Sequence, residues 1–230
     1  IVSTNPEALE KDENGYWTAG MSWTFDQTYT PAARDGVLRR TYTCLGSETI
    51  TDAFGEERPA YVVNVEDPRY MPDERSMRWV DQQSLLTIRS YWADDPSSSN
   101  QFTDASSGWG FTNSTGASTS LMEDPSSLWF NRTTIIGVPG HPNGYTDTNS
   151  SVLVEHNISV TTPAGTFITT KYTITDINDG VVSWELYYNA TVRNHVKVVD
   201  RLPGTHSEMV ERVLVSYDVP TEPVFITESG

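Results

Sequence analysis

The chain has 230 residues, a formal net charge of −16 at pH 7, 37% hydrophobic residues and 11% aromatic residues. This apolar content excludes a generally disordered chain, and the length suits one domain, 1–230, with a large insertion. The acidic balance excludes binding to nucleic acids and to anionic membrane surfaces, because both repel negative charge.

Apolar and polar residues alternate with a period of two along much of the chain, which predicts half-buried strands. Residues 1–15 precede the first of these runs and are expected to form an N-terminal tail. The first run places five apolar residues on one face: Trp17, Ala19, Met21, Trp23 and Phe25. Residues 37–51 and 58–66 are predicted to pair as a hairpin, and residues 77–92 to form one or two further strands.

The stretch 93–127 differs in composition from the predicted strands. It is rich in Ser, Thr, Gly and Asp but still contains aromatic residues such as Phe102 and Trp109. Since flexible linkers lack such residues, we expect a long loop insertion that a few apolar anchors hold in place. A second loop is predicted over residues 137–150, which are rich in Pro and Gly at their start.

The second half of the chain shows the clearest alternation. Its same-face residues form four series: Val152, Val154, His156, Ile158 and Val160; Ile168, Thr170, Tyr172 and Ile174; Val182, Trp184, Leu186 and Tyr188; and Met209, Val213, Val215 and Tyr217. The segment from Asp176 to Gly180 contains an Asp-Gly pair, which predicts a tight hairpin turn. Residues 218–230 are expected to form a C-terminal tail. Because helical periodicity is nearly absent, the predicted fold class is all-β: an antiparallel curled sheet, a β-sandwich or a half-barrel with a long loop insertion.

Several short segments in this half carry a resemblance to a known family. They are Val160 to Phe167, Lys171-Tyr172, Tyr187 to Asn189 with Val196-Lys197, and Val213 to Tyr217. Together, over residues 158–217, they resemble exported half-barrel domains of the lipoprotein-carrier-like type, which occur in bacterial envelope proteins and archaeal surface proteins. The resemblance implies an antiparallel sheet that curls around an apolar groove.

The sequence contains no recognisable catalytic motif. Its four histidines stand at no metal-ligand spacing: His141, His156, His195 and His206. There is no nucleophile elbow and no phosphate-binding glycine loop. The single cysteine, Cys44, excludes an intrachain disulfide and is predicted to be a small buried hydrophobe. We therefore predict no catalytic residue, no metal site and no cofactor, and a protein that is not an enzyme.

Five segments match the acceptor motif for N-glycosylation, at Asn113, Asn131, Asn149, Asn157 and Asn189. The chain starts at Ile1 rather than at Met, and no apolar stretch is long enough to span a bilayer. We therefore expect that a signal peptide was removed before Ile1 and that the protein carries covalent N-glycans outside the cell, at the cell surface. The acidic, Lys-poor and Ser/Thr-rich composition fits a salt-adapted or S-layer-like environment, and it fits a soluble acidic secreted protein equally well. We expect an archaeal source.

The ends of the chain contain short apolar segments that favour β structure. Val224, Phe225 and Ile226 lie near one end, and Ile1 and Val2 at the other. Either segment is a candidate for a strand donated to the sheet of a neighbouring copy. The preferred hypothesis is a structural subunit of a cell-surface filament or coat, which forms a homo-oligomer or polymer by strand donation.

Two other functions stay open at this point. The first is an extracytoplasmic binding module that carries an apolar ligand or a glycan in the concave face of the sheet. The second is a hydrolase with two carboxylates paired in a cleft, because the sequence holds 31 acidic residues.

Overall fold

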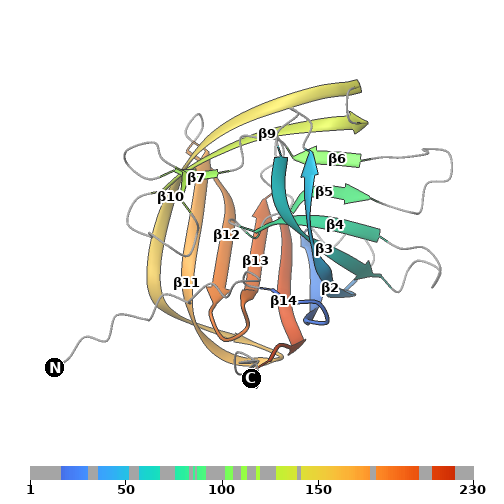
Figure 1. Ribbon diagram of the computed structural model, residues 1–230. Coiled ribbons are helices and arrows are strands. Elements are labelled where there is room, and N and C mark those ends of the chain that lie inside the picture. The colour runs from blue at the N-terminus through green and yellow to red at the C-terminus, as the bar shows by residue number, and fades with distance from the viewer. Residues whose placement is uncertain are drawn as a thin grey trace, which may run out of the picture.

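The computed structural model describes residues 17–30, 36–51, 57–67, 76–82, 85, 87–91, 102–105, 110–112, 118–119, 128–138, 141–176, 180–201 and 209–220. The secondary structure of this part is entirely β, and neighbouring strands run antiparallel (Figure 1). The prediction of an all-β fold with an antiparallel curled sheet is confirmed.

The strands in chain order are β1 (Ser22–Thr30), β2 (Leu38–Thr51), β3 (Glu57–Glu66), β4 (Ser76–Asp81), β5 (Thr87–Tyr91), β6 (Phe102–Ala105), β7 (Gly110–Thr112), β8 (Ser118–Thr119), β9 (Leu128–Val138), β10 (His141–Thr162), β11 (Gly165–Asp176), β12 (Val182–Asn189), β13 (Asn194–Arg201) and β14 (Met209–Asp218). They form one sheet in the order β10-β11-β12-β13-β14-β1-β2-β3-β4-β5-β6-β9-β7-β8, and β9 also pairs with β10.

The sheet curls so that one of its faces is enclosed. Figure 1 shows the strand direction turning from nearly upright in β11 to β14 to nearly horizontal in β4 to β6, while β9 and β10 arch over the top. This turning is the accumulated right-handed twist of neighbouring strands. Buried side chains from both halves of the sheet therefore share one hydrophobic core on the concave face.

Three aromatic side chains join the two halves of the sheet inside this core. The Trp17 ring lies 4.5 Å from the Trp23 ring and stacks on the Tyr61 ring at 5.0 Å, measured between ring centroids. The indole nitrogen of Trp17 donates to the carbonyl of Arg193 at 2.6 Å, and that of Trp23 donates to the carbonyl of Val192 at 2.9 Å. Since buried indole N–H groups need acceptors, these bonds fix the turn between β12 and β13 against the start of β1.

Both predicted hairpins are confirmed. Strands β11 and β12 pair from Thr170–Tyr188 to Thr175–Val182. The turn between them includes Gly180, whose φ of 71° suits glycine and whose N–H donates to the carbonyl of Asp176 at 2.9 Å. Strands β2 and β3 form the other hairpin, whose connection at 52–56 lies outside the described residues. Strands β4 and β5 occupy the predicted 77–92 region.

On β14 the prediction chose the wrong face. Val210 and Leu214 are buried, whereas Tyr217 is 38% exposed and Met209, Val213 and Val215 are only half-buried. Arg212 stands between the two buried residues, and its register partner on β1 is the buried Gln27. A charged residue in the inward series removed the apolar signal from that face, so the pattern pointed to the other one.

The predicted face of β11 is also corrected. Ile168, expected beside Tyr172, is 58% exposed, while Thr169 is buried and Phe167 packs against the core. A β-bulge in β10 lies opposite this point, where the register shifts between Glu155 and Ile158. A bulge adds one residue to one strand and bends the pair, so the strict alternation of the sequence does not continue across it.

The two predicted loops turn out differently. Three short strands, β6 to β8, occupy part of the 93–127 stretch, and the rest of that stretch lies outside the described residues. The prediction of a loop over 137–150 is wrong, because β9 continues to Val138 and β10 begins at His141. Residues 139–140 between the two strands lie outside the described residues, and the polar start of β10 gives no apolar alternation to detect.

The predicted tails fall mainly outside the described part of the chain. Residues 1–16 and 221–230 are not described, and with them the five candidate residues for strand donation: Ile1, Val2, Val224, Phe225 and Ile226. Of the predicted C-terminal tail, Asp218 completes β14 and Val219 is buried against the core.

Candidate functional site

Polar side chains occupy inward positions on neighbouring strands of the concave face. We call five of them the interior arginine cluster: Arg40, Tyr42, Arg78, His195 and Arg212. They come from β2, β4, β13 and β14, which the sheet order brings close together through β1 and β3. Each side chain points toward the enclosed face of the sheet. This direction follows from its neighbours on the same face, two positions along the strand or opposite on the next strand, which include buried apolar residues.

Arg40 is the best-anchored member of the cluster. Its side chain is only 6% exposed, its Nε donates to the Asp67 carboxylate at 2.7 Å, and its Nη1 donates to the Gln27 amide oxygen at 3.0 Å. Burial disfavours its charge, but Tyr42 and Asp67 outweigh that effect and raise the pKa of Arg40 above its usual value. These contacts give Arg40 a structural role, since a buried charge needs such partners.

Tyr42 lies at the centre of the cluster. The guanidinium carbon of Arg78 is 5.3 Å from the centroid of the Tyr42 ring, and Phe25 meets that ring edge-on at 5.6 Å. Burial alone would raise the pKa of the Tyr42 hydroxyl, but Arg78, Arg212 and Arg40 outweigh it and lower this pKa. The interior around Tyr42 is therefore electrostatically positive, although the whole chain is strongly acidic.

His195 borders the cluster on β13. It is 5% exposed and packs edge-on against Tyr188, with 6.0 Å between ring centroids. Burial and the nearby charge of Arg212 lower its pKa to about 3, so the imidazole is neutral at physiological pH.

One buried polar atom of the cluster, Nε2 of His195, has no hydrogen-bond partner within the described part of the chain. The Tyr42 hydroxyl is buried as well, and a hydrogen bond from Arg212 helps to lower its pKa. More than nine in ten buried polar atoms in proteins have a partner, from the protein or from water. Nε2 of His195 is therefore an exception to this rule among the described residues.

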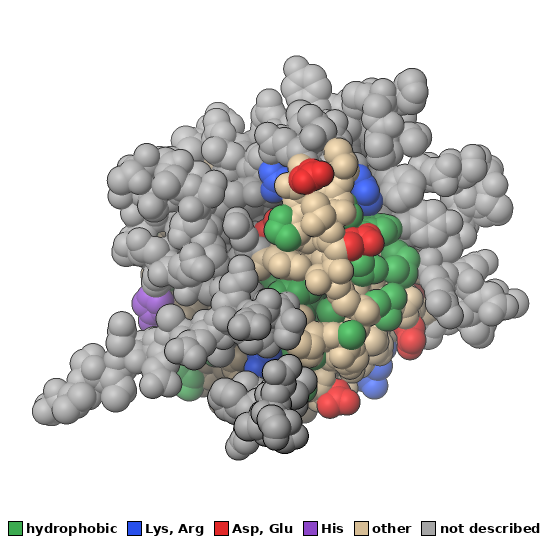
Figure 2. Space-filling model, in the orientation of Figure 1, with side chains coloured by type: hydrophobic (Ala, Val, Ile, Leu, Met, Phe, Trp, Pro, Cys, Tyr) green, Lys and Arg blue, Asp and Glu red, His purple; other side chains and the backbone are tan. Residues whose placement is uncertain are grey.

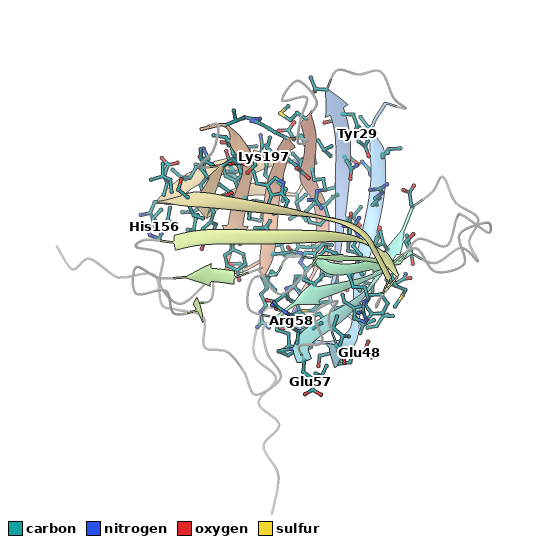
Figure 3. All side chains as sticks on the ribbon, turned by 90° about the horizontal axis from the view of Figure 1, so that it is seen from above. Tyr29, Glu48, Glu57, Arg58, His156 and Lys197 are labelled. Atoms are coloured by element: carbon teal, nitrogen blue, oxygen red, sulfur yellow. The ribbon has the colours of Figure 1, made fainter. Side chains whose placement is uncertain are left out.

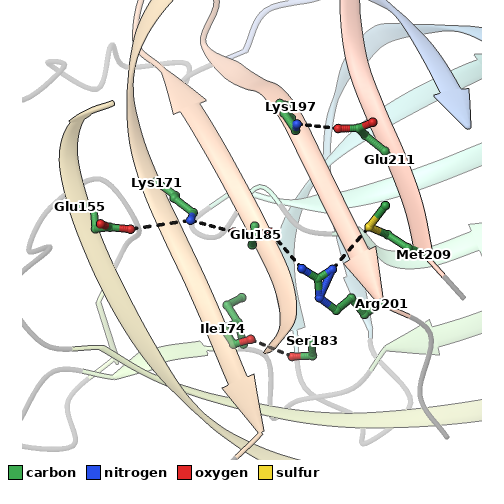
Figure 4. Close-up of polar contacts among 9 residues, drawn as sticks. All are labelled: Glu155, Lys171, Ile174, Ser183, Glu185, Lys197, Arg201, Met209 and Glu211. Atoms are coloured by element: carbon green, nitrogen blue, oxygen red, sulfur yellow. Dashed lines mark hydrogen bonds and ion pairs between the residues drawn. The ribbon is translucent and has the colours of Figure 1, made fainter. Parts of the chain in front are cut away.

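The outer face of β10 to β14 has a different electrostatic character (Figure 4). Glu185 accepts from Lys171 at 2.7 Å and from Arg201 at 3.4 Å, and Lys171 also reaches Glu155 at 3.8 Å. The hydrogen bond to Glu185 raises the pKa of Lys171. With the further pair Lys197–Glu211, three acids balance three bases, and such half-exposed pairs add little stability. The outer network is locally neutral, in contrast to the positive interior.

The exposed large apolar side chains are spread over several strands and do not line up along a single one. Figure 2 shows hydrophobic side chains interspersed with charged groups on one face of the described part. The exposed ones are Val37, Leu45, Leu153, Ile168 and Tyr217. Single exposed apolar residues of this kind are normal on protein surfaces.

The other residues singled out in the sequence occupy separate places. Cys44 is buried and unpaired, and burial raises the pKa of its thiol, which confirms the prediction of a small buried hydrophobe. His156 is exposed on β10, far from the interior (Figure 3). The side chain of His141 and all of His206 lie outside the described residues. In the described ranges, no group of three or more His, Cys, Asp or Glu residues is placed to hold a metal ion.

The five predicted glycosylation sites differ in their surroundings. Asn157 is exposed at the bulge, with a positive φ of 59°. Asn189 is half-buried: its amide nitrogen donates to the carbonyl of Ile168 at 2.8 Å, and its amide oxygen accepts from the Val192 N–H at 3.0 Å. Asn131 and Asn149 are opposite each other in the register of β9 and β10, and Asn113 is not described. Glycosylation itself stays a prediction at all five sites.

Sequence reasoning missed the three arginines of the cluster. The signal was present as a basic residue inside an inward apolar series: Arg40 stands between Leu38 and Tyr42, and Arg212 between Val210 and Leu214. If charged residues that fall in an apolar alternating series are also assigned to the buried face, the sequence pattern predicts that Arg40 and Arg212 point inward. It does not show that they approach each other.

Comparison with known proteins adds no assignment. No protein-family model, no curated protein and no solved structure matches the chain. The resemblance of residues 158–217 to lipoprotein-carrier-like domains therefore stays an expectation. Within the described residues, no helix is long and apolar enough to cross a membrane.

Proposed function

We propose that this protein is a non-catalytic, extracytoplasmic binding module that holds an apolar or amphipathic ligand against the concave face of its curled sheet. Ligand sites are typically concave, mostly apolar, and equipped with a few convergent polar groups. The enclosed face has this composition, with Trp23, Phe25 and Val198 buried near polar members of the interior arginine cluster. The observation that carries the proposal is Nε2 of His195, a buried polar atom on this face that has no hydrogen-bond partner within the described part of the chain.

Tryptophan quenching tests this proposal directly. Bromododecanol, a neutral chain with bromine at its tail, should quench the protein's fluorescence in a saturable way below its micelle concentration. Trp23 is fully buried in the core, whereas Trp79 packs with the separate small cluster around Ile50. Trp17 lies in the same core, with its ring 4.5 Å from that of Trp23. The double variant Trp17→Phe, Trp23→Phe should therefore remove much of the saturable quenching, and the matched variant Trp79→Phe should keep it. Quenching that never saturates, or that depends on Trp79 alone, would rule out a ligand in the interior.

A structural subunit is the second candidate, and one feature of β10 favours it. Residues 153–162 pair with β11 on one side, and no described strand pairs with their other edge. Leu153 on this segment is 60% exposed. Such an edge can accept a strand from a neighbouring copy, but the bulge at Asn157 is a device that commonly blunts edges. For this reason we rank the structural role second.

Electron microscopy of the protein taken from its native surface separates the two candidates. Regular fibres that disappear when residues 221–230, or the first few residues, are deleted would establish strand donation. Discrete monomers in both samples would reject it and leave the binding module.

A further inference from the structure

The bulge in β10 leaves one residue without a partner on β11. The register shifts between Glu155 and Ile158, so that two residues of β10 face a single residue of β11. Of these two, His156 approaches Thr170 across the pair, with 3.4 Å between its Nδ1 and the threonine hydroxyl oxygen. Asn157 is therefore the extra residue of the bulge, and its backbone takes the left-handed conformation with φ of 59°.

The side chain of Asn157 is open to the solvent. It is exposed, and its amide makes no hydrogen bond within the described part of the chain. Figure 3 shows the adjacent His156 on the outside of the molecule. Asn157 also begins an acceptor motif for N-glycosylation with Ile158 and Ser159, and the serine is exposed as well. Both polar residues of this motif are therefore accessible in the folded protein.

Asn189 differs from Asn157, although it begins the same kind of motif. Its amide nitrogen donates to the carbonyl of Ile168 at 2.8 Å, and its amide oxygen accepts from the Val192 N–H at 3.0 Å. The amide is therefore held at both of its ends. An enzyme that acts on the folded protein would have to break the bond to Ile168 before the nitrogen could react. We expect Asn189 to stay unmodified, and it serves as the internal comparison for Asn157.

Asn157 lies in the middle of residues 153–162, the part of β10 whose second edge pairs with no described strand. Proteins commonly protect such edges with lysine, proline or a bulge, or they cover them. This segment has the bulge but no lysine and no proline, and its one acidic residue, Glu155, reaches Lys171 on β11 at 3.8 Å. A β-prone edge with so little charge can pair with other chains. At about 3.3 Å per residue, no part of this edge is more than roughly 17 Å from Asn157.

We propose that Asn157 carries an N-linked glycan that covers this edge and prevents β10 from pairing with other chains. The donor is an oligosaccharide bound to a lipid through a phosphate or pyrophosphate group. A bond forms between Nδ2 of Asn157 and the anomeric carbon of the first sugar, and the nitrogen gives up one proton. The bond from that carbon to the phosphate oxygen breaks, and the lipid phosphate leaves with the electron pair. A glycan is bulky and hydrated, so it occupies the space that a partner strand would need. The proposal is independent of any ligand on the concave face.

Glycopeptide mass spectrometry of the protein from its native surface tests whether the site is occupied. Cleavage after Glu155 and Glu185 places Asn157 and Asn189 in different peptides. The peptide that contains Asn157 should carry sugar in most copies, and the peptide that contains Asn189 should be mainly unmodified. Sugar on the Asn189 peptide alone, or on neither peptide, overturns the proposal.

Self-association measures what the glycan does. Ser159→Ala removes the acceptor motif but keeps Asn157 at the bulge, whereas the matched variant Ser159→Thr keeps the motif. Both are produced in a secretory host that attaches N-glycans and are compared by analytical ultracentrifugation. Ser159→Ala should associate at concentrations at least about tenfold lower than the wild type. Ser159→Thr should behave as the wild type, and so should Thr191→Ala, which removes the motif at Asn189. Equal association of Ser159→Ala and Ser159→Thr overturns the protective role.

Enzymatic removal of the glycans from the folded protein provides a check that needs no substitution. The deglycosylated wild type should associate as Ser159→Ala does, and the same treatment of Ser159→Ala should have no further effect. A further increase in the association of Ser159→Ala would assign the protection to other acceptors and refute the role of Asn157.

Discussion

His195 is a buried histidine whose neutral form is required by the fold. Its pKa is lowered from 6.5 to about 3, so between these values the unfolded chain is protonated there and the folded chain is not. Stability is therefore complete above pH 6.5 and decreases as the pH falls toward 3, by about 1.4 kcal/mol per pH unit for this group. Between pH 7 and pH 4.5, we expect the wild type to lose roughly 2–3 kcal/mol more than His195→Gln does.

Urea unfolding at the two pH values measures this difference. The control is His156→Gln, which changes an exposed histidine on β10 and should leave the pH dependence as in the wild type. An equal loss of stability in the wild type and in His195→Gln would mean that His195 is not kept neutral by its surroundings.

Cys44 gives a second prediction for a single residue. It is 1% exposed, and burial raises the pKa of its thiol, so the reactive thiolate is both scarce and shielded. In the folded protein, a thiol reagent such as dithionitrobenzoate should react at least about a hundredfold more slowly than in urea, as expected when reaction requires opening of the core. Rapid labelling of the folded protein at neutral pH would show that this part of β2 opens readily.

Among the strand elements, the β10–β11 pair is shaped by the bulge. Asn157 adopts the left-handed conformation at the bulge, with φ of 59°, and the register shifts there. A β-branched residue is disfavoured in this region by about 1–2 kcal/mol relative to glycine. We therefore expect Asn157→Val to be less stable than Asn157→Gly by that amount in urea unfolding.

Ser159 provides the matched comparison on the same strand. It is exposed and pairs regularly with Ile168 on β11. In a regular strand valine is favoured over glycine, so Ser159→Val should be more stable than Ser159→Gly. If the order of the two substitutions is the same at both positions, the bulge does not set the conformation of Asn157.

For the whole molecule, the net charge of −16 predicts the response to salt. Like charges repel in the compact state, and raising the salt from about 0.01 M to 0.15 M shortens the screening length from roughly 30 to 8 Å. The midpoint of thermal unfolding should therefore rise with sodium chloride at pH 7. Near the sequence pI of 4.5 the net charge vanishes, and the same addition should have little effect. A midpoint that falls with salt at pH 7 would instead indicate that the outer ion pairs dominate.

The sequence by itself determined the fold class, the hairpins and the burial of Cys44. These features depend on local chemistry: alternation with a period of two indicates a strand, and an Asp-Gly pair permits the positive φ of a tight turn. The β11–β12 hairpin around Gly180 and the β2–β3 hairpin follow from such signals alone.

Only the tertiary structure decided which face is buried and which polar residues meet. The buried face of β14 was hidden because Arg212 interrupts it, and that of β11 because a bulge lies on the neighbouring strand. Arg40, Arg78 and Arg212 come from three strands, and the curl of the sheet brings β14 and β4 around a shared interior. A local pattern records the phase of each strand but not the twist between strands, and the candidate site depends on that twist.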